Sequence, residues 1–125
     1  MKIFDSNLII YSSLDEYQQL RSLIMANDVF ILAVTKIETL GYHQLPDEDK
    51  TYFEGFFLQA NVLPITDEIV DKATELRQQR KMSVDDCIIA ATAVLNGFAL
   101  YTNNTKDFIH IPGLTLTVLN PLNER

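Results

Sequence analysis

The chain has 125 residues, 47% of them hydrophobic, which is enough for the core of one domain over residues 1–125. Its net charge of −7 opposes nucleic-acid binding through overall charge, because phosphate contacts normally draw on clustered Lys and Arg side chains. A single cysteine, Cys87, excludes an intramolecular disulfide and a cysteine-based zinc site, and no signal peptide or membrane span is recognisable, so we expect a cytoplasmic protein with no membrane contact.

The predicted elements alternate between strands and helices. Short apolar runs predict strands at residues 1–4, 29–34, 61–65, 98–101 and 114–119, and a proline weakens the third of them. Helices are expected at 7–11, 15–25 and 35–44, in an aromatic-rich stretch ending near 59, from 66 onwards and at 84–96, with a loop or short helix at 103–108. This alternation predicts an α/β fold with three layers, α/β/α, and a mostly parallel central sheet.

Basic residues are dense only at Arg77, Arg80 and Lys81. One interpretation places them in the solvated last turn of a helix, where positive charge complements the helix dipole. The other makes them a local basic patch that, together with bound cations, reverses the repulsion between an acidic chain and RNA. The net charge alone does not choose between the two.

Four acidic residues, Asp5, Glu38, Asp86 and Asp107, each lie where an apolar run gives way to the start of a predicted helix. In a parallel α/β sheet the carboxyl ends of the strands share one edge, and ligands bind there. Carboxylates from four distant parts of the chain could therefore converge on one site. Carboxylate oxygens without His or Cys suit Mg²⁺ or Mn²⁺, so a divalent-metal site is the first hypothesis.

Helix capping is the competing explanation for the same acids. The pairs Thr35–Glu38 and Ser83–Asp86 match the capping box, Asn104–Asp107 matches a looser form of it, and Asp5 could itself be a cap. Carboxylates held together at one edge would repel one another and raise one another's pKa unless a cation or proton neutralises them. A bound divalent ion removes that cost, and a pair of ions could promote in-line hydrolysis of a phosphodiester.

Four sequence blocks, taken in order, resemble the PIN domain, and most closely the VapC-type toxins of bacterial toxin–antitoxin pairs. They are Asp5-Ser6-Asn7, Glu38 in the next helix, residues 83–93 (SVDDCIIAATA), and residues 100–108 (LYTNNTKDF) with IPGL at 111–114. The resemblance covers essentially the whole chain. It implies an endoribonuclease that cleaves RNA with Mg²⁺ or Mn²⁺, forms a homodimer, and is held inactive by a cognate antitoxin protein that occludes the acidic pocket.

The resemblance also implies roles for individual residues. Asp5 and Asp86 would be the principal metal ligands, Glu38 would hold metal-bound water or a second ion, and Asp107 would complete the cluster. Asn7, Thr102 and Asn104 would orient these carboxylates through hydrogen bonds. Asp85 is assigned to a cap or surface role, because neighbours on a helix point about 100° apart. The family more often has Thr at the position of Ser6.

Three other functions can be compared with the nuclease. A receiver-like phosphoacceptor domain has a similar length, and Thr102 and Lys106 fit it superficially, but the first strand ends in one acid rather than a pair. A phosphatase with two aspartates two residues apart fails because the second position is Asn7. A non-catalytic PIN-like interaction module stays open. His43 and His110 are expected in surface or half-buried positions rather than as catalysts.

Overall fold

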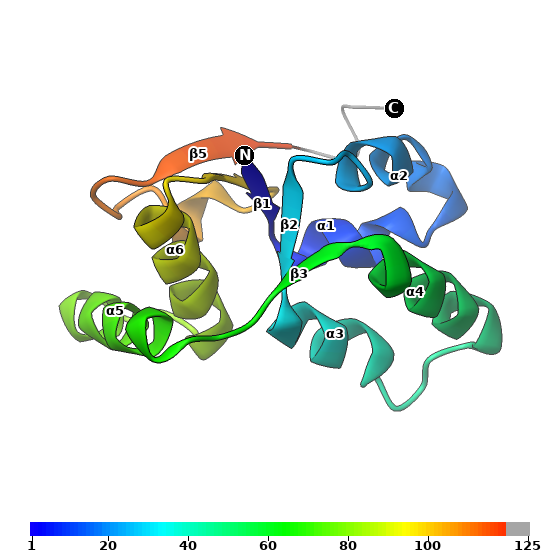
Figure 1. Ribbon diagram of the computed structural model, residues 1–125, viewed down its shortest axis with the longest axis horizontal. Coiled ribbons are helices and arrows are strands. Elements are labelled where there is room, and N and C mark those ends of the chain that lie inside the picture. The colour runs from blue at the N-terminus through cyan, green and yellow to red at the C-terminus, as the bar shows by residue number, and fades with distance from the viewer. Residues whose placement is uncertain (120–125) are drawn as a thin grey trace.

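The computed structural model describes residues 1–119, so the last six residues of the predicted 1–125 domain lie outside the described part. Its centre is a sheet of five strands, β1 (Lys2–Phe4), β2 (Val29–Leu32), β3 (Asn61–Leu63), β4 (Ala99–Thr102) and β5 (Thr115–Val118). The strand order is β3-β2-β1-β4-β5, and every neighbouring pair is parallel (Figure 1). The predicted mostly parallel sheet is confirmed.

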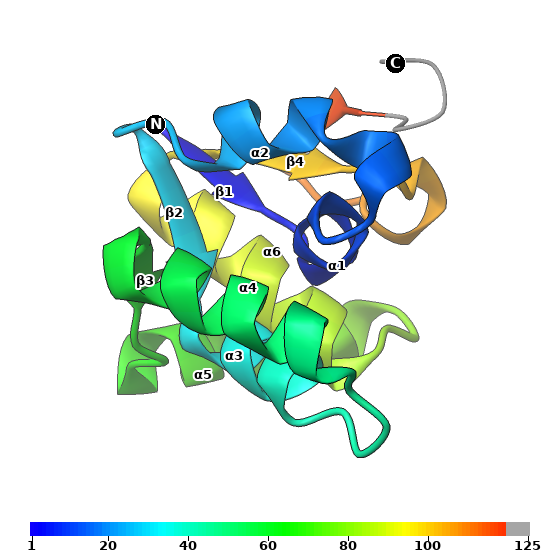
Figure 2. The same ribbon diagram turned by 90° about the vertical axis from the view of Figure 1, so that its right-hand side faces the viewer.

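Helices cover both faces of this sheet (Figures 1 and 2). On one side lie α1 (Ser6–Ser12), α2 (Gln19–Ile24) and α4 (Asp47–Gln59), and on the other lie α5 (Asp67–Gln79) and α6 (Val84–Asn96). The short helix α3 (Ala33–Leu40) follows β2 directly and contacts α1 and α4. Single 3-10 turns occur at η1 (Asp15–Tyr17) and η2 (Thr105–Asp107). The three-layer α/β/α prediction is therefore confirmed.

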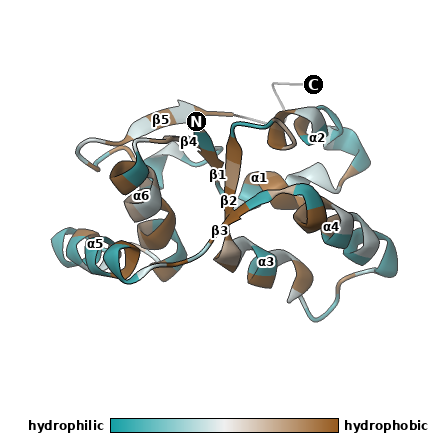
Figure 3. Cartoon of the chain, in the orientation of Figure 1, coloured by the Kyte–Doolittle hydropathy of each residue, from teal (hydrophilic) through white to brown (hydrophobic). Residues whose placement is uncertain are grey.

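The apolar side chains form two cores, one on each face of the sheet, and Figure 3 shows the apolar colouring on the strands and the inward faces of the helices. One core joins Ile3 and Leu100 to α5 and α6. The other joins Phe4 to the aromatic side of α4, where Phe53 and Phe56 are buried. Within residues 1–119, no helix combines the length and apolarity needed to cross a bilayer.

Several predicted boundaries are wrong, among them the end of the helix expected at 35–44, which stops at Leu40, and the end of the strand expected at 61–65, which stops at Leu63. The strand expected at residues 29–34 ends at Leu32, and α3 begins at Ala33 instead of near Thr35. A continuous apolar run is compatible with both a buried strand and the first turn of a buried helix, so the sequence does not show where β2 ends and α3 begins. The helix expected at 15–25 is divided into η1 and α2.

The strand order places a topological switch beside β1. The chain leaves β1 toward β2 on one side and later returns to pair β4 on the other, and such a point opens a crevice at the carboxyl ends of the strands. The order also differs from the 2-1-3-4-5 order of flavodoxin-like and receiver domains. The receiver-like alternative is therefore wrong.

Candidate metal and nuclease site

Asp5 is the first residue after β1, and the neighbouring strand fixes its position at the switch point. Its backbone N–H donates to the carbonyl oxygen of Tyr101 at 2.9 Å. The Thr102 hydroxyl, fully buried at the end of β4, donates to Asp5 Oδ2 at 2.8 Å and accepts from the Asn104 N–H at 3.0 Å. The predicted orienting role of Thr102 agrees with these contacts. Asp5 occupies the N-cap position of α1 without a regular side-chain cap hydrogen bond, although the backbone N–H groups of Ser6 and Asn7 approach its carboxyl and oppose the rise in its pKa.

Asp86 and Asp107 reach the same edge from two other segments. Asp86 lies in the first turn of α6, where its N–H donates to Ser83 Oγ at 3.1 Å, so Ser83 is the cap that the sequence predicted. Asp107 ends the turn η2 after β4, and the Asn104 side-chain amide donates to its Oδ2 at 2.6 Å. Asn104 therefore makes no cap through its side chain and holds a carboxylate instead.

The charges of these three carboxylates interact with one another. Burial raises the pKa of Asp86 to about 6, and the negative charges of Asp107 and Asp5 add to the rise. Burial also raises the pKa of Asp5, with the charge of Asp107 adding to it and the hydrogen bond from Thr102 opposing it. The like-charge repulsion expected from the sequence is therefore present between residues from three distant segments.

Glu38 approaches this group from α3, but the structure gives it a different partner from the predicted one. The Ser6 hydroxyl donates to Glu38 Oε1 at 2.8 Å, and the same oxygen of Ser6 lies 2.9 Å from the buried hydroxyl of Thr35. The N-cap of α3 is Leu32, without a side-chain cap hydrogen bond. The Thr35–Glu38 capping box is therefore wrong, since both residues lie inside the helix and point toward α1.

Two residues at this site, Ser6 and Asp85, were given no part in it by the sequence analysis. Ser6, next to Asp5, connects the start of α1 to Glu38. Asp85 is exposed, as a surface role requires, yet its charge and a carboxyl–carboxyl hydrogen bond contribute to the raised pKa of Glu38, after the larger effect of burial. Asn7 is exposed, and its side chain makes no hydrogen bond to the residues that the structure describes. The contact between Asn7 and the site is instead made by its backbone N–H, which forms a hydrogen bond to the Asp5 carboxyl.

The donor set suits a hard divalent cation, because every side chain at the site offers oxygen and none offers sulfur. In the described part of the chain, no three Asp, Glu, His or Cys side chains are close enough to coordinate one ion together. Mg²⁺ usually takes one or two protein carboxylates directly and keeps several waters. Two carboxylates from the group Asp5, Asp86 and Asp107 would meet that smaller demand.

The parallel order β3-β2-β1-β4-β5, with acids at the ends of β1 and β4 and at the start of α6, agrees with the comparison of the sequence with known families. The family model for the PIN domain matches residues 2–114. The chain therefore belongs to the PIN-domain family. The fold and the family inferred from the four sequence blocks are both confirmed.

Solved structures of similar chains come from several bacteria. A chain of a toxin–antitoxin complex from Klebsiella pneumoniae is 30% identical, with a TM-score of 0.74, over 97% of this chain and 98% of that one. VapBC2 from Rickettsia felis, bound to promoter DNA, gives 20% identity and a TM-score of 0.79 over 95% and 98%. FitAcB from Neisseria gonorrhoeae gives 24% and 0.70 over 98% and 99%. The last two show the fold alone. Comparison with curated protein sequences finds no significant match.

Proposed function

We propose that this PIN-domain chain is a metal-dependent endoribonuclease that hydrolyses RNA phosphodiester bonds with Mg²⁺ or Mn²⁺. One observation carries the proposal, namely that Asp5, Asp86 and Asp107 come from three distant segments and meet at the switch point, where the charge of Asp107 adds to the raised pKa of both Asp5 and Asp86. Uncompensated carboxylates at one place cost stability, and a divalent ion turns that cost into binding energy. Helix capping alone does not account for these acids. The helices or turns that contain or follow Asp5, Glu38 and Asp107 begin without a regular side-chain cap hydrogen bond, and at α6 the cap is Ser83 and not Asp86.

In the proposed reaction a water oxygen forms a bond to phosphorus while the bond from phosphorus to the leaving sugar oxygen breaks. A bound divalent ion would supply positive charge to the phosphate and lower the pKa of the attacking water. Asp5 and Asp86 would hold the ion, and Asp107 would complete the acidic cluster. Thr102 keeps Asp5 in place, and Asn104 keeps Asp107 in place. Glu38, which Ser6 holds through one oxygen and which also contacts Asp85, would hold a metal-bound water or a second ion.

The partners follow from the relatives. We infer that a cognate antitoxin protein binds this chain, because a 30% identical chain of nearly equal length was solved within a toxin–antitoxin complex. The proposal therefore makes the chain the toxin of such a pair, acting on RNA in the cytoplasm as a homodimer. The non-catalytic PIN-like module is the rival proposal, and cleavage of RNA separates the two.

The test is a cleavage assay with the purified wild-type protein on single-stranded and structured RNA. We expect cleavage with Mn²⁺ or Mg²⁺ and none with excess chelator. Asp5→Asn and Asp86→Asn each remove one negative ligand with little change in volume, and we expect the cleavage rate to fall by a factor of about 100 or more, typical of a lost group that acts in the transition state.

Asp67→Asn provides the matched control. Asp67 is an exposed acid in the first turn of α5, a helix capped by Thr66, so it shares the local setting of Asp86 without the other carboxylates. This variant should cleave RNA as the wild type does. Cleavage that survives Asp5→Asn and Asp86→Asn would show that the site is assigned wrongly. A wild-type protein that binds an antitoxin but cuts no RNA with either metal would support the non-catalytic module.

A further inference from the structure

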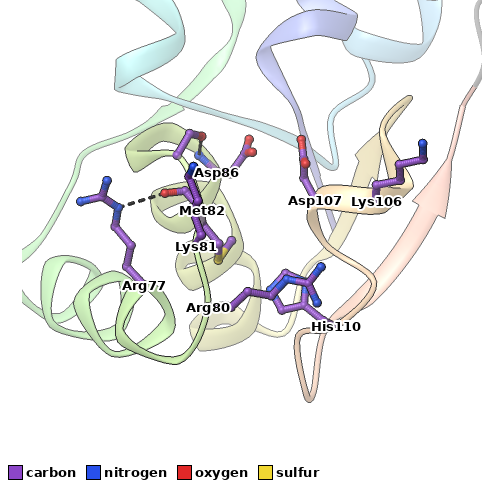
Figure 4. Close-up of a pocket in the computed structure, with 9 residues that line it drawn as sticks. Arg77, Arg80, Lys81, Met82, Asp86, Lys106, Asp107 and His110 are labelled. Atoms are coloured by element: carbon purple, nitrogen blue, oxygen red, sulfur yellow. Dashed lines mark hydrogen bonds between the residues drawn. The ribbon is translucent and has the colours of Figure 1, made fainter.

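A pocket of about 520 Å³ adjoins the carboxylates, between the end of α5, the start of α6 and the segment after β4. Figure 4 shows Asp86 and Asp107 at one part of it, with Arg80 beside His110 and Lys106 beyond Asp107. The residues that line it are Arg77, Arg80, Lys81, Met82, Ser83, Asp86, Lys106, Asp107 and His110. Segments 25 residues apart along the chain therefore bring their cations to one cavity.

These cations are concentrated, and within residues 1–119 none of them forms an ion pair. Four of the nine Lys and Arg residues within 1–119 line this pocket, namely Arg77, Arg80, Lys81 and Lys106. The ion pairs within that range involve Lys2, Arg21 and Lys72, and none involves a cation of the pocket. In a chain with 17 acidic residues, cations left without an acidic partner next to an acidic site are available for an anionic ligand.

The pocket holds both signs of charge, and this restricts the ligand. A small free anion would be attracted by the cations but repelled by Asp86 and Asp107 at the same cavity. A chain of regularly spaced phosphates fits better, because one phosphate can share a metal ion with the carboxylates while the next lies against the cations. RNA backbone has that spacing, and phosphate contacts supply most of the affinity of such binding.

The residues that line the pocket also indicate which features of RNA it does not recognise. Among the residues that line the pocket there is no Phe, Tyr or Trp and the one aromatic ring is that of His110, so base stacking contributes little compared with phosphate contacts. Its volume lies in the range of small-ligand sites, roughly 300–1,000 Å³, which is too small for a duplex. A single strand held by its phosphates agrees with both facts.

We propose that Arg80, Lys81 and Lys106 form a cationic wall that binds the backbone phosphates of single-stranded RNA adjoining the phosphodiester at the carboxylates. The inference rests on the proposed nuclease function and adds the path of the substrate. Arg77 has a partly structural role, since its Nε donates to the carbonyl oxygen of Met82 at 3.0 Å. The basic cluster predicted from the sequence as a helix end or as a local patch thus acts as the patch, extended by Lys106.

The experiment measures binding without cleavage. Fluorescence anisotropy gives the dissociation constant of Asp5→Asn protein for short labelled single-stranded RNAs of two compositions, with Mg²⁺ present, at several KCl concentrations. We add Lys81→Gln with Lys106→Gln to this protein, and as a matched control Lys50→Gln with Lys72→Gln, which removes the same charge from residues that do not line the pocket. Arg80→Gln is a second, single test.

For single strands each lost phosphate contact lowers the slope of log affinity against log salt by about 0.7. We therefore expect Lys81→Gln with Lys106→Gln to lower the slope by about 1.4, equally for both RNAs, Arg80→Gln to lower it by about 0.7, and the control pair to leave it nearly unchanged. Equal slopes for the two pairs would overturn the proposal, as would no RNA binding by the Asp5→Asn protein. Thermal unfolding of each variant checks that it is folded.

Failure of this inference and failure of the nuclease function are distinguishable. If the wild type cleaves RNA but the pocket variants bind as the control does, the nuclease stands and the cationic wall is wrong. If the wild type never cleaves RNA, yet the slope of log affinity against log salt falls only in the pocket variants, the cationic wall is an RNA-binding site and the catalytic proposal is wrong.

Discussion

The same short pattern, a hydroxyl residue followed three positions later by an acid, occurs at the starts of α3 and α6 and produces two different structures. At α6, Ser83 Oγ accepts the N–H of Asp86 at 3.1 Å and begins the helix. At α3, Thr35 is a fully buried residue inside the helix, and its hydroxyl meets Ser6 from α1. One hydroxyl caps a helix, and the other joins two helices.

The difference teaches that a cap pattern acts only where the helix is free to begin. Ser83 is itself exposed in the short irregular segment between α5 and α6, so its hydroxyl is the first available acceptor for the orphan N–H groups. Before Thr35 the apolar chain passes from β2 into α3 at Ala33, so the helix has already begun. At α3 the acid Glu38 has no capping role, whereas at α6 the Asp86 carboxyl keeps a hydrogen bond from Ser83 that opposes the rise in its pKa caused by burial.

The largest effect on stability is expected from Thr35→Val, which keeps the shape of a buried side chain and removes its hydroxyl. The hydrogen bond with Ser6 is lost, so the free energy of unfolding should fall by about 1–2 kcal/mol in chemical denaturation. In a double-mutant cycle, Thr35→Val and Ser6→Ala should be coupled by about 1 kcal/mol. Additive effects of the two changes would mean that the α1–α3 contact is not formed.

A smaller and purely local loss is expected from Ser83→Ala. A cap replaced by Ala costs about 1 kcal/mol, and one replaced by Gly only a few tenths, so Ser83→Gly should be milder than Ser83→Ala. Thr66→Ala is the matched comparison, because Thr66 Oγ1 accepts the Ile69 N–H at the start of α5. Ser83→Ala and Ser6→Ala should add without coupling. Coupling between them would show that the two patterns are alike after all.

Much of the fold was readable from local features. The order of strands and helices follows from where apolar runs alternate with amphipathic ones, and the caps of α5 and α6 follow from Thr66 and Ser83 in exposed segments. The convergence of Asp5, Asp86 and Asp107 was also predictable, because each follows or opens an element at the carboxyl edge of a parallel sheet. These inferences need only short-range pattern and a general rule of topology.

The contacts of Glu38 were not readable in this way. Its partner Ser6 is 32 residues away, and nothing in either local sequence specifies which face of α3 meets α1. The run VFILAV hides the start of α3, because apolar residues satisfy both a strand and a buried helical turn. The cationic wall was missed for the same reason, since Lys106 joins Arg80 and Lys81 only through the packing of β4 beside α6.

The smallest expected effect is on the pH dependence of stability. It is measured by comparing the wild type with Asp86→Asn, in which the carboxyl near the Ser83 cap is replaced by a neutral amide. In the folded protein Asp86 has a pKa of about 6, above the ordinary value of 3.8, so the folded state binds its proton more tightly than the unfolded state. That contribution to stability is full below pH 3.8 and is lost as the pH rises through about 6.

The amide side chain in Asp86→Asn does not titrate, so the variant does not lose stability in this way as the pH rises. Relative to the wild type it should be unchanged near pH 3.8 and gain stability up to about pH 6, reaching about 1 kcal/mol after allowance for solvent screening of a partly exposed group. Thermal unfolding across this range measures the gain, with Thr66→Ala as a variant whose loss stays constant. Added Mg²⁺ should stabilise the wild type more than Asp86→Asn, because the ion neutralises the same repulsion. A gain that is independent of pH, or equal stabilisation of both proteins by Mg²⁺, would mean that repulsion at Asp86 is not what a cation relieves.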